Sequence, residues 1–97
     1  MKFGLYLIPT TNLEIRCIDG RFEYIHPSSY SNCPAGHPDR WRAVLDAPGT
    51  VAPQRDVLAK LAACGRLATW SRAIARLFYG VPDDVELYQY GDFGVNP

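Results

Sequence analysis

Cysteine is scarce in this chain, and the three present, Cys17, Cys33 and Cys64, are an odd number placed far apart. A small domain held together by disulfides normally carries an even and denser set. The apolar run at residues 3–8 is too short for the core of a secretory signal. No apolar run approaches the ~20 residues that cross a membrane. These absences predict a cytoplasmic protein that does not enter a membrane.

An excess of one charge is also lacking, because ten basic and ten acidic residues give a formal net charge of zero. Proteins that bind nucleic acid broadly carry a basic excess, so direct nucleic-acid binding is disfavoured. Low net charge also gives little repulsion between copies, which would permit a homodimer. With 47% apolar and 21% charged residues, the 97-residue chain has the composition of one globular domain, residues 1–97.

Recognisable catalytic motifs are absent as well. There is no Gly-x-Gly-x-x-Gly, no Walker lysine motif and no Cys-x-x-Cys pair. Residues 92–94 carry the letters of the kinase magnesium motif, but a kinase also needs a catalytic loop and a far longer chain. The sequence therefore predicts neither enzymatic activity nor a cofactor.

The clearest structural pattern is a β-hairpin over residues 13–25. Asp19-Gly20 separates two strand-like runs, and this pair suits a type I′ turn, in which both residues have positive φ. The two-residue loop fixes a register in which Cys17 faces Phe22 and Arg16 faces Glu23. The pattern predicts one apolar face and one face carrying the opposite-charge pair.

Three further segments complete the predicted fold. Residues 2–8 and 85–90 read as strands, and residues 54–79 as two helices or one helix bent near Gly65. The regular spacing of apolar residues predicts the buried face of the second helical part: Leu67, Trp70, Ile74, Leu77 and Phe78. The expected fold is α+β, a small and mostly antiparallel sheet with helices on one face.

Residues 26–53 are rich in proline and longer than an ordinary loop. Residues 39–46 predict a short helix within this segment, with Asp39 as its N-cap. Cys33 and His37 are weak metal candidates. A zinc site would also need Cys17 and His26 as ligands, and the spacing of these four residues lacks the compact ligand pairs typical of such a site. The same two residues could form a nucleophile and its base, or be incidental members of a loop.

Aromatic and charged side chains outside the predicted core are the candidates for contact with a partner, since interface hot spots are enriched in Trp, Tyr and Arg. Charge is also unevenly distributed: five basic residues against one acid give +4 over residues 54–80, whereas residues 81–97 carry four acids and no base. The partner-binding candidates are Tyr30, Arg40, Trp41, Arg42, Arg66, Arg72, Arg76, Asp83, Asp84, Tyr88, Tyr90 and Phe93.

Two classes of function remain. One is a non-catalytic interaction module, an inhibitor or regulator that blocks a protein or a protein–nucleic-acid complex. Its binding face would be the acidic end (Asp83, Asp84, Glu86 and Asp92) or an arginine stripe formed by Arg72 and Arg76, which are one helical turn apart. The other is a metal-binding domain or cysteine-dependent enzyme centred on Cys33 and His37. In being short, neutral and without motifs, the chain resembles the small inhibitors of phages and mobile elements, such as anti-CRISPR proteins. This resemblance of general profile implies a macromolecular partner.

Overall fold

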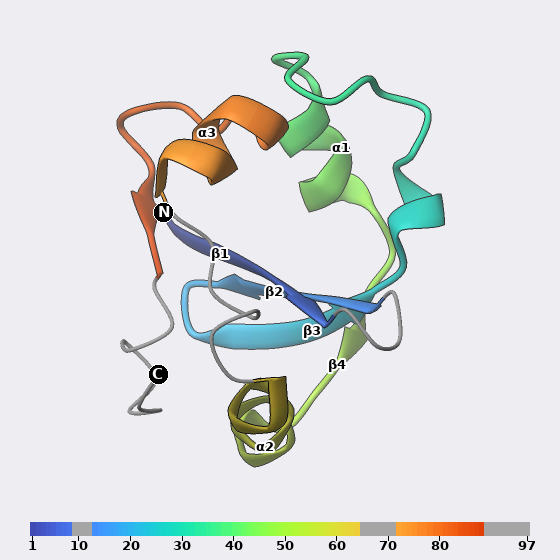
Figure 1. Cartoon of the computed structure of the whole chain (residues 1–97), viewed down its shortest axis with the longest axis vertical. Helices are drawn as coiled ribbons and strands as arrows, with labels where there is room; N and C mark the ends of the chain where they lie inside the picture. The colour runs from blue at the N-terminus through green and yellow to red at the C-terminus, as the bar shows by residue number, and fades with distance from the viewer. Residues whose placement is uncertain (9–12, 65–71, 89–97) are drawn as a thin grey trace.

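The computed structural model describes residues 1–8, 13–64 and 72–88, apart from the side chains of Cys64, Arg72 and Ile74. Five strands form one sheet in the order β4-β3-β2-β1-β5, with helices packed on both faces (Figure 1). The elements are β1 (Lys2–Ile8), β2 (Leu13–Ile18), β3 (Arg21–Ile25), a 3₁₀ turn (Pro27–Ser29), α1 (Arg40–Asp46), β4 (Thr50–Val51), α2 (Gln54–Cys64), α3 (Arg72–Tyr79) and β5 (Glu86–Leu87).

The predicted hairpin is confirmed in both its turn and its register. Asp19 has a φ of 49° and Gly20 a φ of 87°, as a type I′ turn requires. Cys17 pairs with Phe22 and Arg16 with Glu23 across β2 and β3. The turn residues and the alternation of side chains specify the same pairing, so local sequence is sufficient to set this part of the sheet.

The remaining strand pairings make the sheet mostly antiparallel, and the fold is α+β. β1 lies inside the sheet, antiparallel to β2 and parallel to β5. Tyr88 extends the β5 pairing, since its N–H donates to the Phe3 carbonyl at 3.0 Å. The last two residues of the predicted strand 85–90 lie outside the described residues. β4, which pairs antiparallel with β3, is an edge strand that was not predicted.

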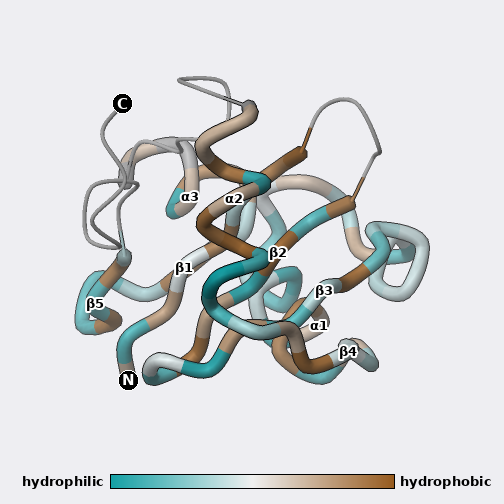
Figure 2. Tube along the Cα trace, turned by 90° about the horizontal axis from the view of Figure 1, so that it is seen from below, coloured by the Kyte–Doolittle hydropathy of each residue, from teal (hydrophilic) through white to brown (hydrophobic). Residues whose placement is uncertain are grey.

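The prediction that helices cover only one face of the sheet is wrong. α1 and α3 lie on one face, and α2 lies on the other (Figure 1). Figure 2 looks onto the sheet from the side that α2 covers. The described parts of residues 54–79 are thus two helices on opposite faces of the sheet, as one of the two predicted alternatives had it. Gly65, where the bend was predicted, lies outside the described residues. None of the helices in the described residues is both long and apolar enough to cross a membrane.

Each face of the sheet has its own hydrophobic core. On the α2 side, Val57 and Leu61 are buried against Ile15, Cys17 and Phe22. The core on the other side is built by β1, β3, α1, α3 and the segments that follow them: Phe3, Leu5, Ile25, Tyr30, Val44, Ala47, Ala75, Tyr79, Val81, Val85 and Leu87. The second face of the hairpin, which carries Arg16 and Glu23, is consequently buried too.

Candidate functional site

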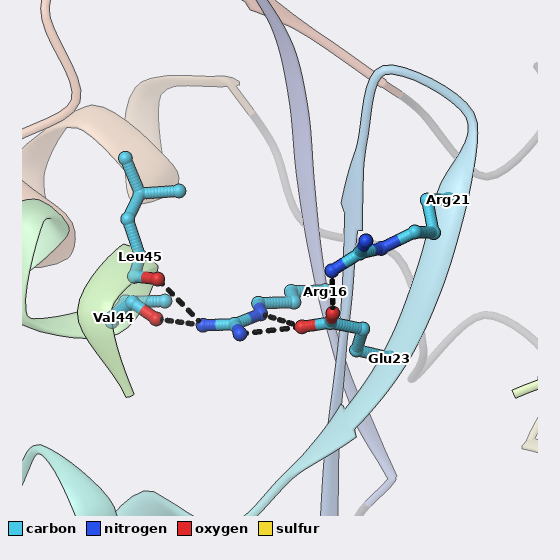
Figure 3. Close-up of polar contacts among 5 residues, drawn as sticks. All are labelled: Arg16, Arg21, Glu23, Val44 and Leu45. Atoms are coloured by element: carbon cyan, nitrogen blue, oxygen red, sulfur yellow. Dashed lines mark hydrogen bonds and ion pairs between the residues drawn. The ribbon is translucent and has the colours of Figure 1, made fainter. Parts of the chain in front are cut away.

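Arg16 and Glu23 form a buried ion pair beneath α1 (Figure 3). They are only 6% and 4% exposed, and Arg16 Nε donates to Glu23 Oε2 at 2.7 Å. Arg21 donates to the other carboxylate oxygen. Burial alone would raise the pKa of Glu23, but the hydrogen bonds and charges of Arg16 and Arg21 bring it below its usual value. Both carboxylate oxygens of Glu23 are thus bound within the fold.

The same guanidinium also binds the C-terminal end of α1. Arg16 Nη1 donates to the carbonyls of Val44 and Leu45, the latter at 3.1 Å (Figure 3). The last carbonyls of a helix lack partners within it, and the helix dipole favours a cation at that end. Arg16 therefore joins the sheet to α1, which is a structural role.

Gly49 leaves room for this ion pair. A Cβ built on Gly49 would lie 2.6 Å from Glu23 Oε2 and 3.0 Å from Ile25 Cγ2. We expect Gly49→Ala to lower the free energy of unfolding by about 1–3 kcal/mol, because the buried carboxylate would have to move. Urea unfolding measures this, with Thr50→Ala at the neighbouring exposed position as the control. Equal stability of the two variants would contradict the tight packing around Glu23.

Glu14, on β2, is the centre of a second buried polar cluster. It is 5% exposed, and Tyr79 of α3 donates a hydrogen bond to Glu14 Oε1 at 3.2 Å. Burial raises the pKa of Glu14 to about 7, and the Tyr79 hydrogen bond and the charge of Arg40 offset only part of that rise. Within the described part of the chain, Glu14 Oε2, Tyr30 Oη and Arg40 Nε have no hydrogen-bond partner.

Arg40 and Tyr30, both sequence candidates for partner contact, belong to this cluster. The Arg40 guanidinium lies 5.5 Å from the ring centroids of Tyr30 and Tyr79, within reach of a cation–π interaction, and its Nη1 donates to the Cys33 carbonyl. Tyr30 is buried, so it packs in the core instead of lying on the surface. With Glu14, Tyr30 and Tyr79 all buried, this arrangement holds α1, α3 and the 30–33 turn together and does not present a carboxylate to a substrate.

Two of the other aromatic candidates, Trp41 and Tyr88, also make contacts within the fold. Trp41, a candidate for partner contact, packs edge-on against Phe3, with ring centroids 6.0 Å apart. The Tyr88 ring lies 4.2 Å from Lys2 Nζ. Arg42 is exposed on α1. The side chain of Arg72, and the whole of Arg66, Tyr90 and Phe93, lie outside the described residues.

The four candidate zinc ligands, Cys17, His26, Cys33 and His37, do not gather into one site in the described part of the chain. Cys17 is buried in the core on the α2 side, and burial raises its pKa, whereas His37 is exposed in the 31–39 loop. His37 Nδ1 accepts a hydrogen bond from the Asp39 N–H at 3.1 Å. Asp39 precedes α1 as predicted, but its side chain makes no capping bond. In residues 1–8, 13–64 and 72–88, no three His, Cys, Asp or Glu side chains gather as metal ligands.

The helix α3 leaves two large apolar side chains exposed. Leu77 is 69% and Phe78 48% exposed, whereas Ala75 and Tyr79 are buried. The predicted buried face of this helix is therefore wrong for Leu77 and Phe78, because the helix is turned so that Tyr79 reaches Glu14. We call the exposed described residues of this helix, Ala73, Leu77 and Phe78, the α3 outer face. None of the three is charged.

The end of α3 and the 31–39 loop hold each other in place next to this face. Gly80, with a φ of 63°, stops the helix as its sequence position predicted, and its N–H donates to the Arg76 carbonyl at 2.9 Å. The Gly36 N–H donates to the Phe78 carbonyl at 2.9 Å. Exposed Pro34 and Ala35 are adjacent to Gly36 in the chain, so they add further uncharged surface near Phe78.

Asp83 and Asp84 lie in the segment that returns from α3 to β5, and Arg76 of α3 binds the backbone of that segment. Arg76 Nη1 donates to the carbonyls of Val81 and Pro82, and its Nη2 donates to the carbonyl of Val85 at 3.1 Å. The arginine is thus turned toward the backbone of the return segment. Asp83 and Asp84, both partner candidates, are exposed there.

Comparison with known proteins adds no further site. No family model, curated protein or solved structure matches the chain. The function is therefore inferred from the surface itself.

Proposed function

We propose that the chain is a small non-catalytic interaction module that binds a macromolecular partner through the α3 outer face. The observation that carries the proposal is the 69% exposure of Leu77 on a helix whose exposed described residues are all uncharged. Exposed apolar surface of this kind is costly in water and marks interaction sites when it is contiguous. Blocking a partner's surface would make the protein an inhibitor or regulator, of the class to which anti-CRISPR proteins and other phage or mobile-element inhibitors belong.

Binding is favoured over catalysis because the buried carboxylates of Glu23 and Glu14 are bound within the fold. Both carboxylate oxygens of Glu23 accept bonds from arginines, and Glu14 is buried against Tyr79. A general acid or base must reach the substrate proton. The alternative Cys/His site centred on Cys33 and His37 has no specific observation in its favour.

The proposed partner is a protein or a protein–nucleic-acid complex in the cytoplasm. The free thiols of Cys17 and Cys33 fit a reducing compartment. Direct contact with a phosphate backbone fits the surface less well, because Arg76 is turned toward backbone carbonyls and Asp83 and Asp84 would repel phosphate.

Replacement of Leu77 by glutamine tests the proposal. We expect Leu77→Gln to reduce capture of the partner from source-cell lysate by at least about tenfold, which corresponds to about 1.4 kcal/mol of binding free energy. Glutamine is a good helix former, and Leu77 is exposed, so stability is expected to change by no more than about 0.5 kcal/mol. Capture is quantified against the wild-type protein by mass spectrometry of the bound fraction.

Val51→Thr is the matched control, because Val51 is another large apolar side chain that is 63% exposed, on the edge strand β4. This variant should capture the partner like the wild-type protein. Undiminished capture by Leu77→Gln, or an equal loss in both variants, would contradict docking through the α3 outer face.

A further inference from the structure

We propose that the partner presents apolar side chains bordered by lysine or arginine, so that its apolar part covers the α3 outer face and its basic part meets Asp83 and Asp84. This inference rests on the proposed function and specifies the chemistry of the partner. It follows from the arrangement of charge around α3.

Helical geometry orders the side chains around α3. Successive residues are about 100° apart in an α-helix. With Ala75 and Tyr79 buried against the core, Leu77 points directly away from the sheet. Arg76 and Phe78 then lie on opposite flanks of Leu77. The residues that Arg76 contacts therefore border the α3 outer face on one side.

Arg76 contacts the segment that returns from α3 to β5. This contact places the acidic residues of that segment on the Arg76 side of the helix. Arg76 Nη1 lies 3.7 Å from Asp83 Oδ1, which places Asp83 beside the helix. The side chain of Arg76 is only 27% exposed, whereas that of Asp83 is fully exposed. Water and a partner therefore meet the carboxylate more than the guanidinium.

Among the described side chains, the residues next to Asp83 add further acids to this flank. Asp84 is exposed next to Asp83, and no ion pair to a described residue is formed by its side chain. Glu86 follows on β5 with a 72% exposed side chain, 4.0 Å from Lys2 Nζ. Lys2 is itself held over the Tyr88 ring. Residues 81–88 thus contribute three acids and no base.

Charge complementarity indicates which kind of partner fits this surface. Surfaces that associate arrange opposite charges across the interface, and like charges placed opposite each other cost several kcal/mol. An acidic border next to an apolar face therefore fits a protein segment with basic residues beside its apolar ones. Nucleic acid and anionic membranes would bring negative charge toward Asp83 and Asp84, so they fit poorly.

Selection from a displayed library of random peptides tests the inference even while the partner is unidentified. The 97-residue chain is the target, and each selected peptide is then measured against the wild-type protein and the variants. We expect the selected peptides to combine apolar residues with lysine or arginine. Their affinity should fall at least about tenfold for Leu77→Gln and several-fold for the double variant Asp83→Asn/Asp84→Asn, and the latter loss should shrink at high salt because exposed charges are screened.

The outcomes separate the two proposals. Selected peptides that lack basic residues, or that bind Asp83→Asn/Asp84→Asn as well as the wild-type protein, would overturn the inference and leave the proposed function standing. If no selected peptide distinguishes wild-type protein from Leu77→Gln, the α3 outer face is not a docking surface and both proposals fail. A dimer in solution that Leu77→Gln dissociates would identify a second copy of the chain as the occupant and would also overturn the inference.

Discussion

Replacement of Arg16 by leucine is expected to lower the free energy of unfolding by about 3–5 kcal/mol, the usual cost of removing one partner of a buried ion pair. Glu23 would stay buried with Arg21 as its remaining cation, and the side chain of Arg21 is 69% exposed. The carbonyls of Val44 and Leu45 would also lose their donor at the end of α1. Urea unfolding of the purified variant measures the loss.

Arg21→Ala is the control for this variant, because it removes the exposed arginine that contacts the same carboxylate. Its expected cost is at most about 1 kcal/mol, as for other exposed ion pairs. The double variant Arg16→Leu/Glu23→Leu should be less destabilised than the two single variants added together, since no charge is left buried alone. A loss for Arg16→Leu no greater than that for Arg21→Ala would show that the buried pair is not what joins the sheet to α1.

Replacement of Glu14 by glutamine is expected to stabilise the protein at pH 8 by up to about 3 kcal/mol and to leave its stability at pH 4 nearly unchanged. Burial raises the pKa of Glu14 from 4.5 to about 7. The folded protein therefore keeps this proton at pH values where the unfolded chain has lost it. The stabilising effect of protonation is complete below about pH 4.5 and is lost as the pH rises through about 7. Glutamine resembles the protonated form at every pH.

The measurement is the free energy of unfolding across this pH range for the wild-type protein and Glu14→Gln. Glu86→Gln removes an exposed carboxylate and should follow the wild-type curve. The wild-type curve should fall between pH 4.5 and 7 relative to that of Glu14→Gln. Parallel curves would mean that the pKa of Glu14 is not raised and would contradict its burial between the sheet and α3.

The parts of the fold that local sequence could predict are those in which turn chemistry and side-chain alternation agree. Asp19-Gly20 allows one tight turn, and that turn fixes which residues of β2 and β3 face each other. Gly80 similarly ends α3 where its sequence position indicated. These residues act through the backbone conformations they permit, which depend little on the rest of the chain.

The arrangement of layers could not be predicted, because it depends on long-range contacts. In the sequence, Arg16 and Glu23 look like residues on an exposed face of a hairpin. Their burial is favourable because the carbonyls at the end of α1 accept hydrogen bonds from Arg16 and because Gly49 has no side chain to clash with Glu23. The orientation of α3 was missed for a related reason. Leu77 and Phe78 suggested the buried face, but Tyr79 can hydrogen-bond Glu14 and therefore takes the inner position, which leaves Leu77 in water.

Hydrogen exchange of the protein with and without its captured partner is the most direct test of docking through the α3 outer face. We expect the partner to slow exchange of the amides in residues 72–80 and in the neighbouring loop at residues 34–38, while exchange in the hairpin at residues 13–25 is unchanged. α3 has only eight residues, so its amides should open readily when the partner is absent. Slowed exchange confined to another surface, such as β4, with residues 72–80 unaffected, would contradict the account.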